Sequence, residues 1–244
     1  MSSKGDNVLK RLFDQYRTKL GITDELLATI ISDHCKRDLA RKSKYQEGEE
    51  AEPALRASNM MRQINAPFTP MMLYRALEML EVKVFNIGIE ARQAKTRRAV
   101  KISIRQIYHD GEYKNQAAID NKNESYNDVN NILKNLFTRI LTALKISNNE
   151  LLNGYAKQYC KRDEARNGRV RTLGNTTTQL MGHKYTPYIF LMATEVIGLS
   201  NMVLYLNVEQ PDGTWIKVSS KVFSVADAMS EEEEVAESIS ILEE

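Results

Sequence analysis

Residues 7–38 read NVLKRLFDQYRTKLGITDELLATIISDHCKRD, and residues 131–163 read NILKNLFTRILTALKISNNELLNGYAKQYCKRD. The two stretches share Leu9 with Leu133 and Phe13 with Phe137 at matching positions. After one inserted residue in the second stretch, both end on the run Cys-Lys-Arg-Asp. Because self-similarity along a chain is the signature of repeat architectures, the pattern indicates a duplicated unit.

The similarity continues downstream of both stretches. Phe68-Thr69-Pro70 returns as Tyr185-Thr186-Pro187, and Asp110-Gly111 returns as Asp212-Gly213. The duplicated unit therefore extends well beyond the opening stretch.

Each copy begins with two predicted helices. In the first copy, apolar residues recur at spacings of three and four, which predicts an amphipathic helix that Gly21 ends. Thr23 or Asp24 can then cap a second helix by accepting its free amide hydrogens. In the second copy we expect one helix over about residues 129–144 and another, capped by Ser147 or Asn148, that runs to about residue 166.

A further helix and two strands follow in each copy. Thr69-Pro70 and Thr186-Pro187 each predict a helix start, since Thr is a good N-cap and Pro suits the first helical position. A third helix is possible over residues 54–64, whereas residues 168–177, GRVRTLGNTT, are expected to form a spacer. Alternation of apolar and polar residues predicts strands over 84–91, 100–107, 202–208 and 214–218.

These elements predict an α+β fold that is predominantly helical, built from two tandem copies of a helix-helix-helix-β-hairpin unit. We expect a first repeat lobe over residues 1–115, a connector over 116–128, a second repeat lobe over 129–225 and an acidic C-terminal tail over 226–244. The tail beyond Met229 holds seven glutamates and no base, so residues 1–229 carry a net charge of +9 against +2 for the whole chain. A basic body favours a polyanionic partner. The tail itself is either a competitor for that partner or a solubilising extension.

Several classes of protein are disfavoured. The start of the chain has no apolar segment typical of a secretory signal, and we expect no membrane association because the longest apolar stretch is too short to span a bilayer. Two cysteines without a paired-cysteine motif favour a reducing compartment and argue against a zinc module. We therefore expect a cytoplasmic protein.

Catalysis has little support in the sequence. His34, His109 and His183 lie in unrelated contexts, and the chain shows no nucleophile elbow, phosphate-binding glycine loop or metal-ligand spacing. His34 next to Cys35 suggests a metal ligand, but the second copy has Tyr159 there, so a structural role is favoured. We expect no enzymatic activity, no catalytic residue, no metal site and no cofactor.

Basic residues are the better candidates for function, and they form three clusters. Their alternative interpretation is a solvated helix end or a charged edge strand that blocks aggregation. Because the helix-end cluster recurs in both copies, nucleic acid becomes the leading partner. The clusters are Lys36, Arg37, Arg41, Lys42 and Lys44; Lys161, Arg162, Arg166, Arg169 and Arg171; and Lys95, Arg97, Arg98, Lys101 and Arg105.

The predicted strand of alternating polarity, followed by two helices joined at Lys-Ile-Ser-Asn, resembles the ribbon-helix-helix family of transcription regulators. The helix pair at Gly-Ile-Thr-Asp is also similar to that family, and its extended members in conjugative plasmids accommodate additional elements. The resemblance implies that a polar strand face enters the major groove while the start of the second helix binds phosphate. Lys101, Ser103 and Arg105 would then read bases, and amides near Ser147 and Asn148 would hold phosphate.

The leading hypothesis is a sequence-specific DNA-binding transcriptional regulator of a plasmid or phage. Its expected partner is double-stranded DNA, and the chain could form a homodimer. One alternative is a non-enzymatic scaffold that self-assembles or binds a partner through its apolar helices. Another is an RNA-binding or single-strand-binding protein, in which Tyr45, Tyr108, Tyr113 and Trp215 stack on bases, although aromatic residues in strands more often pack.

Overall fold

The computed structural model describes residues 8–42, 53–65, 68–109, 111–115, 132–146, 149–168, 170–182 and 185–220. Within these residues the chain forms eight helices and five strands, which confirms the α+β class. The helices are α1 Val8–Lys19, α2 Asp24–Lys42, α3 Pro53–Asn65, α4 Pro70–Met79, α6 Ile132–Ala143, α7 Asn149–Asn167, α8 Leu173–Met181 and α9 Pro187–Val196. The strands are β1 Val84–Gln93, β2 Ala99–His109, β3 Glu112–Asn115, β4 Leu199–Glu209 and β5 Trp215–Ser219.

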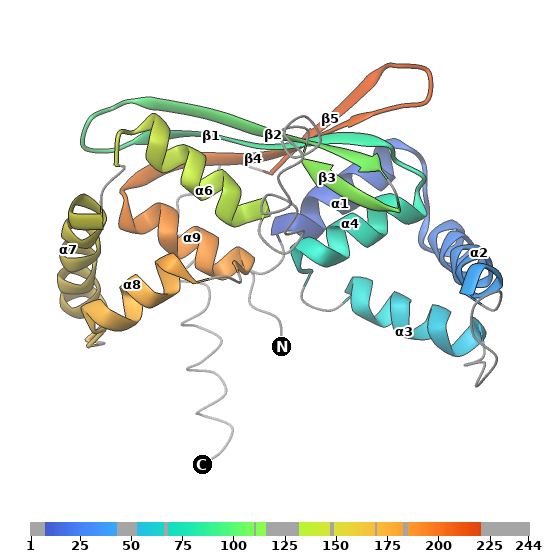
Figure 1. Cartoon of the computed structure of the whole chain (residues 1–244), viewed down its shortest axis with the longest axis horizontal. Coiled ribbons are helices and arrows are strands. Elements are labelled where there is room, and N and C mark those ends of the chain that lie inside the picture. Colours follow the sequence, from blue (N-terminus) through green and yellow to red (C-terminus); the bar gives the residue numbers. More distant parts are fainter. Residues whose placement is uncertain are drawn as a thin grey trace, which may run out of the picture.

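All five strands belong to one antiparallel sheet in the order β3-β2-β1-β4-β5. The N-terminal half of the molecule (residues 8–115) contributes β1 to β3, and the C-terminal half (residues 132–220) contributes β4 and β5. The two segments predicted as separate lobes therefore share a sheet, which is joined at its centre by the pairing of β1 with β4. Figure 1 shows all the described helices on one side of this sheet, and no described helix lies on the opposite side.

The alternation along the strands explains why only one side is covered. Ile87 and Ile89 of β1 and Leu204 and Leu206 of β4 are fully buried, and they point toward the helices. Successive side chains of a strand point to opposite faces of a sheet, so the residues between them face away from the helices. We call the uncovered side the outer face.

The two halves interlock. The β1–β2 hairpin extends over the C-terminal half, and the β4–β5 hairpin extends in the opposite direction over the N-terminal half (Figure 1). Helix α6 packs on β2, and α1 packs on β4 and β5. Arg139 of α6 donates to the backbone oxygen of Ser103 at 3.1 Å, while Lys19 of α1 donates to that of Lys217 at 2.9 Å. Each first helix thus covers a strand of the other half's hairpin, which protects backbone groups that could otherwise pair with another chain.

Two glutamines fasten the hairpins across the molecule. Gln93, which is 2% exposed at the end of β1, donates to the Tyr155 hydroxyl at 3.3 Å and to the Ile197 backbone oxygen at 3.2 Å. Gln210, directly after β4, donates to the Tyr16 hydroxyl at 3.1 Å. Each hairpin is therefore hydrogen-bonded, at its far end, to the half that did not supply it.

Most helix starts were predicted correctly from residues close to them in the sequence. The hydroxyls of Thr69 and Thr186 accept from the amides of Met72 and Ile189, which confirms both predicted caps. The first helix ends at Gly21 as predicted, with φ of +69°, and Lys145 adopts the same left-handed conformation after α6 with φ of +60°. A residue other than glycine is strained there, because its Cβ crowds the following carbonyl.

The predicted three-helix unit and the predicted spacer need correction. Residues 168–177 do not form a continuous spacer, since α8 begins at Leu173 after Thr172, whose hydroxyl accepts from the Asn175 amide. With α3 and α8 present, each hairpin is preceded by four helices in the described residues. Thr176 and Leu180 are buried, and this packing against α7 and α9 outweighs the weak helix propensity of a glycine-rich and threonine-rich segment.

Strand β3 was also not predicted. It pairs with β2 from Gln106 to His109, and it lies in the last residues of the predicted first lobe, for which no strand was expected. The Tyr113 side chain is 4% exposed, and its hydroxyl donates to the Val82 backbone oxygen at 2.7 Å. Tyr113 therefore packs in the core rather than offering a surface for base stacking. Tyr45, the predicted cap residues Ser147 and Asn148, and the acidic tail lie outside the described residues.

Candidate nucleic-acid interface

The polar face predicted for the second strand lies on the outer face of the sheet. In β2, Val100 and Ile104 are buried, whereas Lys101, Ser103 and Arg105 are exposed. This confirms the predicted orientation of the strand. The three side chains predicted to read bases are thus accessible, on the side of the sheet that bears no helix (Figure 1).

The lysines of the outer face converge on one carboxylate. Glu90 of β1 lies 3.1 Å from the Lys101 ammonium and 3.6 Å from that of Lys217, a residue of β5. The hydrogen bond from Lys101, together with the charge of both lysines, holds the pKa of Glu90 below its ordinary value. Arg105 forms a similar pair with Glu209 at 3.4 Å. Exposed ion pairs of this kind contribute about 0 to 1 kcal/mol, so phosphate oxygens can replace the carboxylates at little cost.

Two aromatic rings lie among these cations. The Lys217 ammonium lies 4.4 Å from the centre of the Tyr205 ring, and the Arg105 guanidinium lies 5.8 Å from the centre of the Trp215 ring. Tyr205 is only 8% exposed, whereas Trp215 is 39% exposed. The Tyr205 ring rests on Gly88, where an added Cβ would come within 2.2 Å of its Cζ atom. Trp215 is therefore the aromatic ring of this group with a face available to a partner.

The basic loop between β1 and β2 forms the far end of the hairpin. Lys95, Arg97 and Arg98 are all exposed there. The backbone N–H of Gln93 donates to the backbone oxygen of Arg98 at 2.9 Å, and the backbone N–H of Arg97 donates to the backbone oxygen of Gln93 at 2.7 Å. Because Gln93 is itself anchored to the C-terminal half, the loop is held on the rest of the molecule rather than on its own strands alone.

The outer face and this loop carry a positive excess. Seven cationic side chains and two carboxylates occupy β1, β2, β4, β5 and the β1–β2 loop on this side, and they are Arg92, Lys95, Arg97, Arg98, Lys101, Arg105, Lys217, Glu90 and Glu209. Sequence reasoning identified the residues of the second strand and loop, and it named Trp215 as a stacking residue in the single-strand alternative, but it missed Lys217 and Glu90. The alternation of apolar and polar residues over 214–218 could have placed Lys217 on the polar face of its strand. Its proximity to Lys101 depends on the pairing of β1 with β4, which no local pattern reveals.

The width of the sheet limits how this face can approach a duplex. Neighbouring strands lie about 4.8 Å apart, so the four strands that cross the level of Arg105 span about 14 Å between their outer axes. The major groove of B-DNA is about 12 Å wide and admits a two-stranded ribbon. Toward the β1–β2 loop the sheet narrows to three strands, β2, β1 and β4, because β3 pairs with β2 only from Gln106 onward and β5 pairs with β4 no further than Tyr205. These three strands span about 10 Å between their outer axes, so this end fits the groove better than the middle of the sheet does.

The helix-end clusters lie elsewhere. Helices α2 and α7 occupy opposite ends of the molecule, and each runs away from the sheet (Figure 1). Lys36 pairs with Asp33 at 3.2 Å and Arg37 pairs with Glu81 at 2.8 Å, while Lys161 and Arg162 are exposed on α7. The structure thus does not bring these clusters together with the outer face. The side chains of Arg41, Lys42 and Arg166 are not described, and Lys44 and Arg169 lie outside the described residues.

Arg171 has an internal role. Its Nε lies 2.5 Å from a carboxylate oxygen of Asp163, which is buried at the end of α7, and a second nitrogen donates to the Tyr188 hydroxyl of α9 at 3.3 Å. Burial disfavours the charged guanidinium, but the hydrogen bonds to Tyr188 and Asp163 hold the pKa of Arg171 above its ordinary value. Arg171 therefore joins α7 to α9, and we leave it out of the interface.

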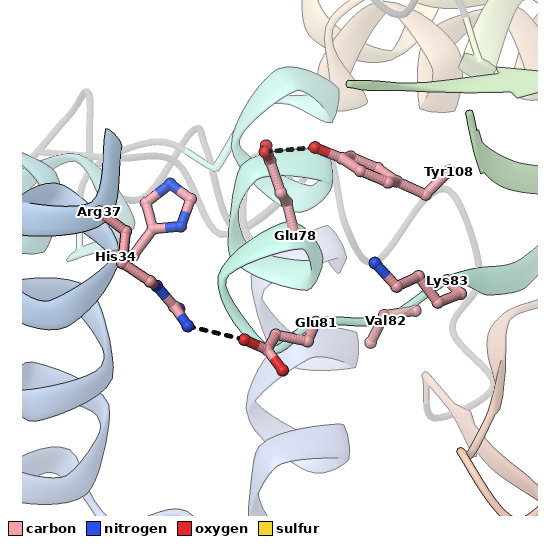
Figure 2. Close-up of a pocket in the computed structure, with 7 residues that line it drawn as sticks. All are labelled: His34, Arg37, Glu78, Glu81, Val82, Lys83 and Tyr108. Carbon is pink, nitrogen blue, oxygen red and sulfur yellow. Dashed lines mark hydrogen bonds and ion pairs between the residues drawn. The ribbon is translucent and has the colours of Figure 1, made fainter. Parts of the chain in front are cut away.

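A separate cavity of about 310 Å³ lies between α2, α4 and the starts of the strands. Figure 2 shows His34 and Arg37 on one side of it and Lys83 and Tyr108 on the other, with Glu78 and Glu81 between them. The Tyr108 hydroxyl donates to Glu78 at 2.8 Å, and the Lys83 ammonium lies 5.1 Å from the centre of the Tyr108 ring. Arg37, predicted to contact nucleic acid, thus lines a polar cavity in which it pairs with Glu81.

Other kinds of site find little support in the described part of the chain. Among the described residues, no three or more His, Cys, Asp or Glu side chains are grouped in a way that could hold a metal ion. Cys35 and Cys160 are both buried, and neither forms a disulfide within the described residues. None of the described helices is long and apolar enough to cross a membrane. Comparison of the chain with protein-family models, curated proteins and solved structures finds no match.

Proposed function

We propose that this chain is a sequence-specific DNA-binding regulator that meets double-stranded DNA with the outer face of its sheet. The observation that carries the proposal is the excess of exposed cations in the β1–β2 loop, along β2 and at Lys217 of β5, on the side of the sheet where no described helix lies. Contacts between cationic side chains and phosphates supply most of the affinity of proteins for DNA.

Different parts of this strip have different roles in the proposal. The β1–β2 loop lies where the sheet narrows to three strands, so Arg97 and Arg98 of the loop and Lys101 beside it are the candidates for base contacts. Arginine can form two hydrogen bonds with the edge of guanine. Arg105 and Lys217 lie where the sheet is too wide for the groove, and they bind phosphates on its rim.

The proposal also includes the tandem architecture. In this view the halves are two copies of one unit of four helices and a hairpin, and the outer face joins the strands of both. The likeness to ribbon-helix-helix regulators is retained in one respect, namely that a polar strand face meets the duplex. A plasmid or phage origin remains part of the proposal.

Charge reversal at the hairpin end tests the proposal. We expect Arg97→Glu/Arg98→Glu to weaken binding to a labelled 30-base-pair duplex by at least 10-fold at moderate salt. Each lost phosphate contact lowers the dependence of log affinity on log salt by about 0.9, so a fall of about 2 in the slope would indicate that both arginines contact phosphates, whereas an affinity loss with a smaller change of slope agrees with the base contacts assigned to them. Fluorescence anisotropy at several salt concentrations measures both quantities.

The matched control is Lys161→Glu/Arg162→Glu, which makes the same change of net charge on α7, away from the sheet. This variant should lower affinity far less than the hairpin variant does. Equal losses in the two variants would show that net charge alone governs binding and would contradict the assigned surface. A wild-type chain that binds no duplex at low salt would contradict the function itself.

Single-stranded nucleic acid is a second candidate, because Trp215 lies 39% exposed on an open sheet face beside Arg105. Stacking of a base on an aromatic side chain contributes about 1 to 3 kcal/mol, and sheet faces with exposed aromatic rings bind RNA in this way. If this candidate holds, Trp215→Ala will weaken binding to a 20-nucleotide single strand by about 10-fold without weakening binding to a duplex. A wild-type preference for the duplex argues against it.

A further inference from the structure

We propose that a single chain binds an inverted repeat whose two half-sites differ in sequence. The inference rests on the proposed function, since it specifies the kind of duplex that the outer face fits. It follows from the register of the central strand pair, from the length of each hairpin and from the unequal charge of the two hairpin ends.

The central strand pair contains an approximate two-fold axis. Gly88 follows Pro70 of α4 by as many residues as Tyr205 follows Pro187 of α9, so the two occupy equivalent positions in the two halves. In the antiparallel pairing of β1 with β4, Gly88 lies directly opposite Tyr205. Equivalent residues can face each other in this way only at a two-fold axis. The axis therefore passes between Gly88 and Tyr205 and relates one hairpin to the other.

The same pair explains why both hairpins come from one chain. An added Cβ on Gly88 would lie 2.2 Å from the Tyr205 ring and 2.6 Å from the Ile102 backbone oxygen. Pairing of β4 with the β4 strand of a second chain would place Tyr205 opposite Tyr205, without the space that Gly88 provides. The glycine in one half and the tyrosine in the other thus fit each other, and a single chain supplies both sides of the interface.

The length of the hairpins fits two successive turns of the major groove. Half-sites read from one side of a duplex lie about 34 to 36 Å apart, which places each about 17 to 18 Å from the axis. At about 3.3 Å per residue, a strand covers that distance in about five residues. Five residues beyond Gly88 is Gln93, and five beyond Tyr205 is Gln210. These are the two residues that anchor the hairpin ends to the opposite halves.

The two hairpin ends differ in charge, which makes the half-sites unequal. The β1–β2 end carries Arg97 and Arg98, whereas the β4–β5 end is the turn Pro211-Asp212-Gly213. Asp212 accepts from the Thr214 hydroxyl at 2.7 Å and from its amide at 2.9 Å, which fixes the carboxylate at the turn. Phosphate repels this carboxylate, so the second hairpin end makes fewer contacts with its half-site than the first does. We expect the first half-site to be the more strictly specified.

Selection of duplexes from a random library by the purified full-length chain tests the inference. The expected product is an inverted repeat with one strict and one relaxed half-site, centred about 10 base pairs apart and bound by one chain, as measured by light scattering of the complex. Insertion of five base pairs between the half-sites should weaken binding by at least 10-fold, because it moves one half-site to the opposite side of the duplex.

Two charge-reversal variants show which residues select the sequence of the half-sites. Arg97→Glu/Arg98→Glu should abolish selection of the strict half-site, whereas Lys217→Glu, which removes a phosphate contact near the axis, should weaken binding without changing the selected sequence. Direct repeats, two chains on each inverted repeat or indifference to the insertion would overturn this inference while leaving duplex binding intact. If no duplex is selected and none is retained at low salt, the proposed function fails, and this inference fails with it.

Discussion

The N-terminal and C-terminal halves have the same arrangement of helices and hairpin, but the polar contacts between their helices differ. Helices α2 and α7 are each 19 residues long, and each supports a helix that starts with Thr-Pro. In the C-terminal half, a buried ion pair between Arg171 and Asp163 joins α7 to α9. In the N-terminal half, α2 meets the end of α4 through the exposed pair of Arg37 with Glu81, beside an open cavity. The apolar positions thus determine the shape, while the polar positions are free to diverge.

The hairpins differ in the same way. Both are anchored across the molecule by a glutamine, yet one ends in a basic loop and the other in a turn with an aspartate. Shared features serve the packing of the halves, and divergent features lie at surfaces or cavities. Function is therefore to be sought where the halves differ.

The largest expected effect comes from the ion pair that only the C-terminal half buries. Arg171→Met should lower the free energy of unfolding by about 3 to 5 kcal/mol, because it leaves the Asp163 carboxylate buried without its charged partner. Arg37→Met removes an exposed pair and should cost less than about 1 kcal/mol. Urea unfolding of the two variants measures the difference. Similar costs would show that the halves are held together more alike than the structure indicates.

A second effect concerns the axis between the halves. Gly88→Ala should cost about 2 to 3 kcal/mol, since the new methyl group meets the Tyr205 ring and the Ile102 backbone oxygen. The cost should shrink by about 1 kcal/mol or more when Tyr205 is alanine. A double-mutant cycle on thermal or urea unfolding gives the coupling energy. A coupling near zero would mean that the tyrosine ring does not occupy the space above Gly88.

The cross-molecular glutamines should contribute less. Gln93→Leu removes three hydrogen bonds from a buried side chain, two of them to the other half, and should cost about 1 to 3 kcal/mol. Gln210→Leu removes one such bond from a half-buried side chain and should cost about 1 kcal/mol. Hydrogen exchange should show faster opening of the hairpin that each variant releases. If Gln93→Leu opened neither β1 nor β2, the anchoring role would be wrong.

The smallest effect tests the left-handed residues that end the first helix of each half. Lys145→Gly should raise the free energy of unfolding by about 0.5 to 1 kcal/mol, because glycine adopts a φ of +60° without strain. Gly21→Lys, the reverse change, should lower it by about 1 kcal/mol, although no neighbouring atom lies within 4 Å of its added Cβ. Thermal unfolding detects both shifts, and a shift of the same sign in both variants would contradict the explanation.

Much of the local structure could be predicted from residue patterns. The Thr-Pro caps, the end of the first helix at Gly21 and the polar face of β2 were all predicted, because each depends on residues close together in the chain. Helix α8 was missed, since its stability comes from burial of Leu180 against other helices rather than from propensity. The internal role of Arg171 was missed for a similar reason. Its partner Asp163 lies on α7, so the chain must turn after the end of this helix to bring the two side chains together.

The sequence by itself determined most of the helices and strands, with α8 and β3 as exceptions, and it determined which side of each predicted strand is apolar. The period of a strand is local, so the pattern of Lys101, Ser103 and Arg105 was sufficient to place them on one face. Only the tertiary structure decided that β1 pairs with β4, that Gly88 meets Tyr205 and that Lys217 lies beside Glu90. Those contacts exist because both halves bury their apolar strand faces in a single sheet, and the choice of strand partners depends on the whole core rather than on neighbours in the chain.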